Sequence, residues 1–514
     1  MPILKLWQNP VCRIIPFSGT PLLSELLQQE GIAAVHPCGG KGRCGNCALR
    51  AEGNLSAPTQ AEEQAGTRLS CQIRLLGDAE VWLREDSGVV ETSGSTPVLG
   101  DAMEGTYGAA VDIGTTTIAM QLYDLRRGLL VAREGTMNPQ RSIAADVMGR
   151  IGAAMEGQRS LLQDLVGEAL KTLLRKACAQ AEISLKQVGS MVITGNTTML
   201  YLLTGRDPSC LSAAPFQADD LFGRMDTLFG IPVYYPPCIN AFVGADITCA
   251  LLDSGLFGKT ETALLCDIGT NGELALWKDG QLSVTSTAAG PAFEGAGISC
   301  GCGSIPGAID RVWTEEGSIH IRTIGNQPAV GLCGSGLVDA VAAFLEVEAI
   351  DETGAVEEDM LPLTARVKLL PADIRAVQLA KGAIAAGIRT LLELAQVPET
   401  RIDTLYIAGG FGSHLNVASA AAIGLIPAGL QSKVKVLGNS ALSGAARLLL
   451  DRNQIATAEM LARTAVPVTL SGNSRFSHNF MNAMLFGEED IFAMLLDLNM
   501  PNVNGFEVLE YFDR

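Results

Sequence analysis

The hydrophobic positions near the start of the chain change from alternation to a helical spacing. Leu4 and Leu6 alternate with polar neighbours, and an apolar run resumes over residues 11–15, which predicts a β-hairpin. Thr20-Pro21 then has the form of a helix cap followed by proline at the first helical position. The leucines that continue this helix are Leu22, Leu23, Leu26 and Leu27. The first 30 residues are therefore expected to form strands and one helix.

After residue 108 the same order of hydrophobic patterns occurs twice. Each time a strand, a glycine turn and a second strand are followed by an amphipathic helix, another strand with a glycine turn, and a further helix opening. These matching signals in the same order predict a duplicated α/β unit. They lie at 109–123, 161–179, 191–196 and 244–246 in the first copy, and at 264–277, 384–394, 405–412 and 438–440 in the second.

Between the first unit and the duplicated region, periodicity disappears and small polar residues predominate. Such a composition is typical of a flexible linker. We therefore predict a first domain over residues 1–85 and a linker over 86–107. The two halves of a larger α/β domain are expected over 108–262 and 263–487.

The charge of the chain narrows the choice of partners. With 55 acidic and 37 basic residues among 514, the formal net charge is −18. A field of that sign disfavours nucleic acid and anionic membranes as partners. The N-terminus lacks the pattern of a signal peptide, and we find no apolar stretch of the roughly 18 residues that a membrane span needs. We therefore expect a cytoplasmic protein whose 13 cysteines act as thiols and metal ligands rather than disulfides.

Four cysteines have the spacing of an iron–sulfur site. Cys38, Cys44 and Cys47 lie within ten residues, and Cys71 completes the pattern Cys-x5-Cys-x2-Cys-x23-Cys. Three thiolates this close repel one another unless a cation holds them, and the intervening glycines leave room for a loop around a cluster. We predict that these four cysteines hold a [2Fe–2S] cluster. The alternatives are a structural zinc site, for which a second Cys-x2-Cys pair is missing, and unrelated buried cysteines.

Two strand-end turns carry the residues of a phosphate site. Asp-Ile-Gly-Thr begins at Asp112 and again at Asp267. In each turn the loop N–H groups and hydroxyls can hold phosphate oxygens, and the carboxylate can hold Mg²⁺. Two such loops facing each other would grip a nucleotide from both sides, whereas the alternative for each is an ordinary turn. The predicted nucleotide contacts are Gly114, Thr115, Thr116, Thr117, Gly269, Thr270, Asn271 and Gly272.

These segments resemble two known families. Residues 1–85 resemble [2Fe–2S] ferredoxins, with five residues rather than the plant-type four between the first two cysteines. The later region resembles the actin-like ATPases, a superfamily that includes sugar kinases and heat-shock chaperones. The resemblance implies a multi-domain α/β chain, in which a β-grasp ferredoxin-like α+β domain precedes a duplicated actin-like (ribonuclease H-like) α/β ATPase domain. It also implies an adenosine loop with contacts at Gly409, Gly410 and Gly412.

The fusion of the two modules is similar to the reductive activators of corrinoid proteins over about residues 1–487. This similarity implies an ATP-dependent redox enzyme with ATP, Mg²⁺ and a [2Fe–2S] cluster as cofactors. It would take an electron from an upstream low-potential reductant and pass it to a corrinoid protein or corrinoid-dependent methyltransferase, restoring Co(I) from Co(II). A homodimer formed through the ATPase half is also implied. The segments that carry the similarity are 138–140 with 146–147, 195–199, 288–295, 333–336 and 408–412.

A glycine-rich segment over residues 287–303 holds Glu294. We predict Glu294 as a third catalytic carboxylate beside Asp112 and Asp267, because such loops often carry function. Three further cysteines suggest either a second metal site or, as we expect, small buried side chains. These cysteines are Cys300, Cys302 and Cys333.

The last residues have a different character. The segment 494–507 resembles the phosphoacceptor strand and loop of a response-regulator receiver, with Asp497 at the acceptor position. A fragment of this size cannot bury a core of its own, and the acidic residues that would hold Mg²⁺ are missing. We therefore predict that residues 488–514 form a truncated receiver-like tail and not a folded domain.

Other functions remain open from the sequence. One is an activator of a different low-potential enzyme, such as a 2-hydroxyacyl-CoA dehydratase, although such activators usually lack a ferredoxin module. Another is a small-molecule kinase with a regulatory iron–sulfur domain, and a third is a redox-sensing binding module without turnover. The iron content and the phosphorylation of a sugar or acid would distinguish these functions from the first.

Overall fold

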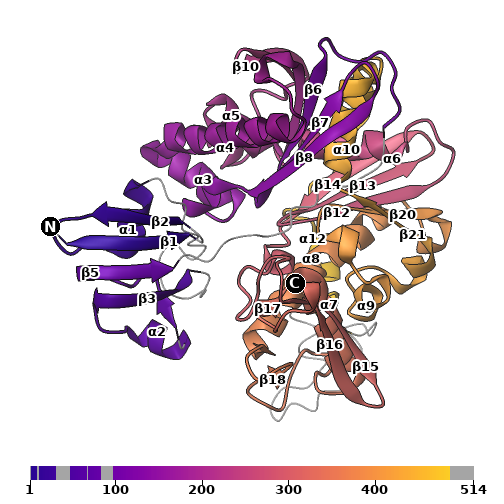
Figure 1. Ribbon diagram of the computed structural model, residues 1–514. Helices are drawn as coiled ribbons and strands as arrows, with labels where there is room; N and C mark the ends of the chain where they lie inside the picture. Colours follow the sequence, from indigo (N-terminus) through magenta and orange to yellow (C-terminus); the bar gives the residue numbers. More distant parts are fainter. Residues whose placement is uncertain (1, 9–10, 31–46, 66, 83–96, 487–514) are drawn as a thin grey trace.

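The computed structural model describes residues 2–8, 11–30, 47–65, 67–82 and 97–486. A small N-terminal sheet domain lies beside a larger α/β body (Figure 1). No helix in these ranges has the length and apolar character needed to cross a bilayer. The predicted receiver-like tail, residues 488–514, lies outside the described residues.

The N-terminal domain is a five-stranded sheet with two short helices. Its strands are β1 (Ile3–Gln8), β2 (Val11–Pro16), β3 (Ala48–Leu55), β4 (Arg68–Leu69) and β5 (Leu75–Trp82), and its helices are α1 (Leu23–Gln29) and α2 (Gln60–Ala65). The strand order is β2-β1-β5-β3-β4, and the predicted β1–β2 hairpin is confirmed. The helix begins at Leu23 rather than directly after Thr20, because Leu22 forms a β-bridge with Arg74.

The first half of the α/β body is a six-stranded sheet with helices packed on it. Its strands are β6 (Tyr107–Ile113), β7 (Thr117–Asp124), β8 (Leu129–Met137), β9 (Val188–Gly195), β10 (Arg224–Leu228) and β11 (Ile231–Tyr235). Its helices are α3 (Val147–Ala153), α4 (Arg159–Gln180), α5 (Thr197–Thr204) and α6 (Ala245–Ser254). The strand order is β10-β11-β9-β6-β7-β8.

The second half repeats this plan. Its strands are β12 (Ala263–Ile268), β13 (Gly272–Lys278), β14 (Gln281–Thr287), β20 (Thr404–Ala408), β21 (Val434–Gly438) and β22 (Val466–Pro467). Its helices are α8 (Pro371–Leu394), α9 (Val417–Ala422), α10 (Ser440–Leu450), α11 (Gln454–Thr464) and α12 (Ser474–Asn482). The order β21-β20-β12-β13-β14 corresponds to β11-β9-β6-β7-β8 of the first half, so the predicted duplication is confirmed.

An additional lobe is inserted between β14 and α8 of the second half. It consists of β15 (Ala308–Glu315), β16 (Ser318–Thr323), β17 (Gly331–Leu332), α7 (Gly334–Glu346), β18 (Leu361–Pro362) and β19 (Lys368–Leu369). The strands β16-β15-β17 form a small sheet of their own, and α7 packs on β15. This lobe supplies one wall of the cleft described below.

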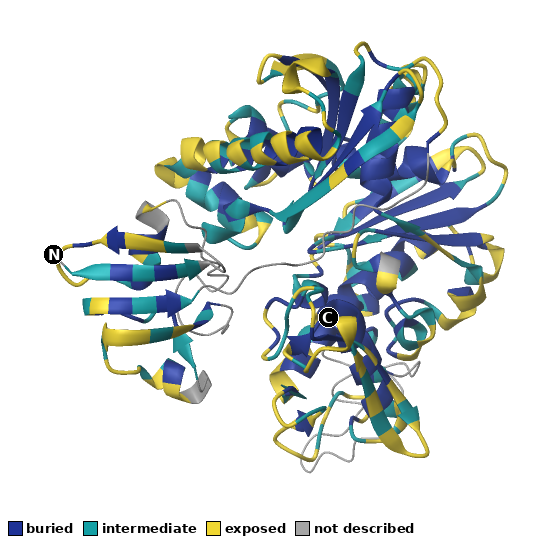
Figure 2. Cartoon of the chain, in the orientation of Figure 1, coloured by how far each residue is buried: buried dark blue, intermediate teal, exposed yellow. Residues whose placement is uncertain are grey.

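The two halves meet along helices α6 and α10. Gly444 of α10 packs against the backbone of α6, where a Cβ would overlap the carbonyl oxygen of Cys249. Beside this contact Arg447 Nε donates to the buried Asp253 Oδ1 at 2.7 Å. The other face of α10 lies on β6 and β9 of the first sheet, and the central strands of both sheets are buried (Figure 2). Close helix packing therefore sets how the two sheets face each other.

The second part of the predicted linker departs from a free tether. Gly100 N–H donates to Leu450 O at 3.0 Å, and Met103 N–H donates to Leu449 O at 2.9 Å. Arg452 pairs with Asp101 at 2.9 Å, and the Met103 side chain is buried. Residues 100–103 are thus held on the end of α10, because the backbone groups there accept hydrogen bonds that the local sequence does not reveal.

A buried lysine fastens the end of the described chain to α8. Lys381 is 1% exposed, its ammonium donates to Leu485 O, and it lies 5.1 Å from the ring centre of Phe486. One turn earlier, Gln378 Nε2 donates to Met484 O at 2.7 Å. Burial, and to a smaller extent Arg389, lowers the pKa of Lys381 to about 7.

The buried ammonium predicts a pH dependence of stability. Below pH 7 the folded protein bears the full cost of the buried charge, and as pH rises from 7 toward 10.5 the folded state loses this proton before the unfolded state does. The melting temperature of the wild type, relative to that of Lys381→Met, should therefore rise by roughly 5 °C between pH 7 and pH 9.5. A difference that is the same at both pH values would contradict this account.

Candidate functional site

A cleft of about 1150 Å³ brings the three predicted loops together. Eleven residues are predicted from the first loop, the second loop and the carboxylates, and ten of them line this cleft. Of the three residues predicted in the third loop, two line it. The predicted residues that line the cleft are Asp112, Gly114, Thr115, Thr116, Thr117, Asp267, Gly269, Thr270, Asn271, Glu294, Gly409 and Gly410. Gly272 and Gly412 do not line the cleft, because they pack behind it against Thr287 and Ile407.

The first loop, residues 112–117, is held by side chains of its own half. Gly114 N–H donates to Thr117 O at 2.9 Å and closes the turn between β6 and β7. Asn138 Nδ2 donates to Gly114 O at 2.8 Å, and the fully buried Arg150 donates through Nη2 to Thr115 O at 2.6 Å. These contacts use the loop carbonyls, and Thr115 Oγ1 accepts from Asn196 Nδ2 at 3.1 Å, so the hydroxyls of Thr116 and Thr117 are left to face the cleft.

The second loop, residues 267–273, packs against the third. Gly269 N–H donates to Asn271 O at 3.0 Å, which closes the turn between β12 and β13. Gly409 of the third loop has a φ of +89°, and a Cβ there would overlap Asp267 Oδ1. Glycine is required at this position both by the left-handed backbone and by the close approach to the carboxylate.

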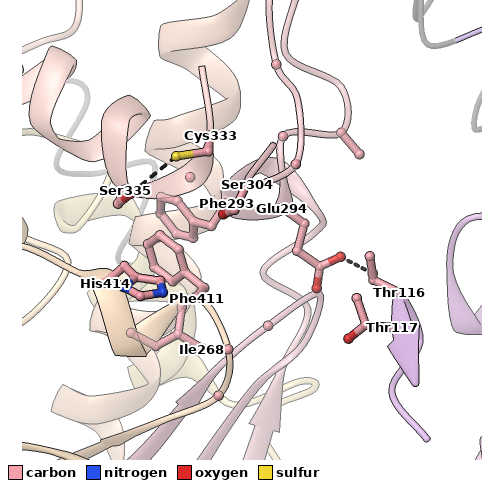
Figure 3. A pocket seen from close by; sticks show the side chains of 18 of the residues that line it. Thr116, Thr117, Ile268, Phe293, Glu294, Ser304, Cys333, Ser335, Phe411 and His414 are labelled. Atoms are coloured by element: carbon pink, nitrogen blue, oxygen red, sulfur yellow. Dashed lines mark hydrogen bonds between the residues drawn. The ribbon is translucent and has the colours of Figure 1, made fainter. Parts of the chain in front are cut away.

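Glu294 connects the two predicted phosphate loops across the cleft. It ends the short 3-10 helix η5 (Ala292–Glu294), and the left-handed Gly295 follows it at a φ of +78°. Thr116 Oγ1 of the first loop donates to Glu294 Oε2, and Thr270 Oγ1 of the second loop donates to Glu294 Oε1 at 2.9 Å. Figure 3 shows the contact with Thr116. One carboxylate therefore accepts hydrogen bonds from hydroxyls of both halves, at the place where phosphate oxygens are predicted to bind.

Four further carboxyl groups lie around the loops, where Glu273 is buried and Asp112, Asp246 and Asp267 are half-buried. Burial raises the pKa of Asp112 to about 6, although a hydrogen bond from Asn439 Nδ2 at 3.1 Å opposes the shift. Burial, with the neighbouring Asp112 and Glu294, raises the pKa of Asp267 to about 7. The pKa values of Asp246 and Glu273 are also raised, by burial first and by these neighbours second. Such mutual repulsion is relieved when a cation is bound.

The acidic groups suit a cation that other ligands complete. Within the described residues no three His, Cys, Asp or Glu side chains converge closely enough to hold a metal ion by themselves. Mg²⁺ usually keeps several waters and takes one or two carboxylates together with substrate phosphates. The donor set of Asp112 and Asp267, facing loops that can hold phosphate, fits that mode of binding.

Two aromatic rings join the third loop to Glu294. Phe293 and Phe411 are stacked, with ring centres 5.1 Å apart and planes at 9° (Figure 3). Phe293 directly precedes Glu294, and Phe411 lies inside the predicted adenosine loop. The stack therefore places the predicted adenosine loop against the residue that precedes Glu294.

The N-terminal domain holds part of the predicted cluster site. Cys47 Sγ and Cys71 Sγ are 3.3 Å apart and both are buried, and Gln72 Nε2 donates to Cys71 Sγ at 3.6 Å. The hydrogen bond with Cys71, together with burial, raises the pKa of Cys47, so two thiolates at this separation need a cation. The sulfur pair fits a shared iron site. Cys38 and Cys44 lie outside the described residues.

Three cysteines line the cleft at separate places. Cys333 Sγ is 3.3 Å from Ser335 Oγ, whereas Cys300 Sγ contacts Arg366 O at 3.9 Å. Cys333 is buried as expected, but Cys300 and Cys302 are only half-buried. In the described ranges no group of three metal-binding side chains includes them.

Sequence reasoning missed several residues of the site, among them Asp246 and Asn439. Asp246 is the second residue of α6, and Asn439 caps α10, where its Oδ1 accepts from Leu442 N–H at 2.9 Å while its Nδ2 donates to Asp112. Both line the cleft. The repeated pattern at 244–246 and 438–440 was the available signal, because it places a polar side chain at equivalent helix starts in the two halves.

Comparisons with known families match three stretches of the chain. Residues 10–76 match the 2Fe-2S iron-sulfur cluster binding domain. Residues 107–259 match the family described as the RACo middle region, and residues 261–495 match the C-terminal domain of RACo, the ASKHA domain. The predicted fold class, a ferredoxin-like domain followed by an actin-like ATPase domain, is thereby confirmed.

Individual proteins are similar over most of the chain. The corrinoid activation enzyme RamQ of Eubacterium limosum is 34% identical over 421 residues, which cover 74% of this chain and 70% of the relative. The [Co(II) methylated amine-specific corrinoid protein] reductase of Methanosarcina barkeri is 26% identical over 389 residues, covering 68% and 71%. A solved structure, a reductive activator for corrinoid, iron-sulfur protein, superimposes with a TM-score of 0.68 at 27% identity, covering 94% of this chain and 98% of its own.

The contact between Gly409 and Asp267 predicts a selective effect on nucleotide binding. In Gly409→Ala the new methyl group must displace the Asp267 carboxylate, so we expect ATP binding to weaken by roughly tenfold or more. Gly280→Ala is the matched control, because Gly280 has a similar φ of +79° but nothing within 4 Å of its Cβ position. Calorimetric titration with ATP should show normal affinity in the control. Equal losses in both variants would mean that backbone strain alone is responsible.

Proposed function

Because the chain belongs to the family of reductive activators of corrinoid proteins, we propose that it is an ATP-dependent enzyme that passes a low-potential electron from its [2Fe–2S] cluster to a corrinoid protein, restoring Co(I) from Co(II). The observation that carries the proposal is the pairing of two sites in one chain. A buried sulfur pair lies in the first domain, and a cleft with two facing phosphate loops lies in the second.

The sulfur pair would hold one side of the cluster, and Cys38 and Cys44 are proposed to complete the ligand set. When bound, a [2Fe–2S] cluster supplies a one-electron carrier whose potential depends on hydrogen bonds to its sulfurs. Gln72 donates such a bond to Cys71. Ala48, the residue after Cys47, is among the residues that line the cleft, which supports a position of the cluster near the nucleotide module.

The cleft would hold ATP with its phosphates between the two loops. Hydroxyls of the first and second loops would donate to phosphate oxygens, and Asp112 and Asp267 would hold Mg²⁺. The third loop would take the adenosine. The two carboxylates repel each other at neutral pH, so the cation that accompanies ATP would also relieve the strain of the site.

Glu294 would couple the nucleotide to the shape of the cleft. Its carboxylate and a phosphate group both accept hydrogen bonds, so they compete for the hydroxyls of Thr116 and Thr270. Phosphate binding would release Glu294, and the Phe293–Phe411 stack would carry the change to the third loop. A gap of 100 mV costs roughly 2.3 kcal/mol per electron, and differential binding of the nucleotide to two states of the protein can supply such an amount.

The relatives support a corrinoid protein as the acceptor, because the names of all three refer to corrinoid proteins or their activation. An upstream low-potential reductant, a homodimer through the ATPase half and a cytoplasmic location remain parts of the proposal. The family favours this function over activation of a 2-hydroxyacyl-CoA dehydratase and over a kinase with a regulatory cluster.

The proposal is tested by following Co(I) directly. Reduced protein is mixed anaerobically with a Co(II) corrinoid protein, with Mg-ATP or without nucleotide, and the Co(I) absorption is recorded. We expect Co(I) to form only with Mg-ATP. Equal formation of Co(I) without nucleotide would show that electron transfer is not coupled to the ATPase half.

Because the two modules are separate, we predict that the cluster can be lost without loss of ATP binding. Cys47→Ser should remove the visible absorption of the cluster and lower the iron content below the two atoms per chain that a [2Fe–2S] cluster contains. Because the sulfur pair lies in a separate domain, ATP affinity should change by less than about twofold. Cys12→Ser, in the same domain but outside the predicted ligand set, serves as control. Loss of ATP binding in Cys47→Ser alone would mean that the modules do not fold independently.

The position of Glu294 between the two loops predicts that its substitution has opposite effects on ATP binding and on ATP hydrolysis. Glu294→Gln removes a negative charge that competes with phosphate, so ATP should bind at least as tightly as in the wild type. If Glu294 also orients the attacking water as a catalytic carboxylate, hydrolysis should slow by roughly 10²-fold. The exposed Glu316→Gln is the control. Weaker ATP binding with unchanged turnover would overturn both roles.

A further inference from the structure

Arg141 is fixed beside the first phosphate loop by the backbone on which it stands. It belongs to the 3-10 helix η1 (Pro139–Ser142), which follows directly on β8. Asn138 caps this turn and also holds the loop, because its N–H donates to Thr116 O at 2.8 Å and its Nδ2 donates to Gly114 O at 2.8 Å. Arg141 N–H in turn donates to Asn138 O at 3.1 Å. The arginine therefore moves with the loop that is proposed to bind phosphate.

The guanidinium of Arg141 lines the cleft with unused donors. Its Nη1 is buried, and among the described residues it has no hydrogen-bond acceptor. No carboxylate in these ranges forms an ion pair with it either. A buried donor of a charged group without an acceptor is costly, which makes such a group a strong candidate for contact with an anion.

Two other arginines near the cleft, Arg150 and Arg322, have other tasks. Arg150 lies behind the loop, where Nη2 donates to Thr115 O, Nε to Ala144 O at 3.0 Å and Nη1 to Gln140 Oε1 at 3.3 Å. At the far wall of the cleft, in the inserted lobe, Arg322 is paired with Asp310 at 2.6 Å. Among the described residues of the first half that line the cleft, Arg141 is thus the arginine whose charge is available to a ligand.

The charge of the site requires such a cation. Asp112, Asp246, Asp267, Glu273 and Glu294 all line the cleft, so the walls repel a polyphosphate except where a positive group compensates. Mg²⁺ would compensate near the aspartates. A planar guanidinium presents several N–H donors in a fixed geometry that matches phosphate oxygens.

We propose that Arg141 contacts the terminal phosphate of bound ATP and so distinguishes ATP from ADP. The inference rests on the proposed function, since it assumes that the facing loops hold the phosphates. It adds a recognition element that none of the three predicted loops contains. Because Arg141 is carried by the turn that holds Gly114 and Thr116, its contact would also report the presence of the terminal phosphate to the first loop.

The test compares the affinities of two nucleotides in two arginine variants of the full chain. Arg141→Gln removes the charge and most donors, whereas Arg127→Gln, at the exposed turn between β7 and β8, changes the same residue type far from the cleft. Binding of ADP and of a non-hydrolysable ATP analogue is measured by calorimetric titration with Mg²⁺. Melting temperatures confirm that both variants are folded.

We expect Arg141→Gln to weaken binding of the ATP analogue by roughly tenfold to a hundredfold, and binding of ADP by less than about twofold. Arg141→Lys should recover part of the loss, because it keeps the charge but not the planar donors. Equal effects on both nucleotides, or none on either, would overturn the proposal for Arg141 alone. If the wild type binds neither nucleotide, the proposed function itself fails, and the two failures are therefore distinguishable.

Discussion

One carboxylate stands where the two halves of the duplicated fold come together. Glu294 accepts hydrogen bonds from Thr116 of the first loop and Thr270 of the second, although neither threonine is near it or near the other in sequence. The duplication makes this contact available, because equivalent strand-end turns face each other when the two sheets pack through α6 and α10. On the proposal that a nucleotide competes for these hydroxyls, its binding would act on both halves at once.

The carboxyl groups around this contact are a cost to the folded protein. Burial raises the pKa values of Asp112 and Asp267, the neighbouring Asp112 raises that of Asp267 further, and Asp246 and Glu273 add to the repulsion. Replacement of one of them by a neutral side chain would be expected to favour folding, as is common at functional sites. Their presence is understandable if the site is built for a cation with phosphates. The stacked Phe293 and Phe411 then provide the rigid connection to the third loop that a cluster of repelling charges cannot provide.

Much of the fold follows from local patterns, and the limits of prediction are equally physical. The duplication was predictable because each strand-end turn carries its own signature within a few residues. The contact of Glu294 with Thr116 was not predictable, because the two residues are 178 positions apart and meet only after both halves have packed. For the same reason the docking of Met103 on the end of α10 was not predicted, because the composition of this segment is typical of a free linker. Asp246 was visible in a repeated motif, but its role depends on the distance to Asp112 and Asp267, which no local pattern contains.

A crystal structure of the protein with Mg²⁺ and a non-hydrolysable ATP analogue tests the central claim most directly. The account predicts that the hydroxyls of Thr116 and Thr270 donate to phosphate oxygens, and that the Glu294 carboxylate has left at least one of them. A structure in which Glu294 keeps both hydroxyls while the nucleotide binds elsewhere would contradict the idea that nucleotide and carboxylate compete for the same place.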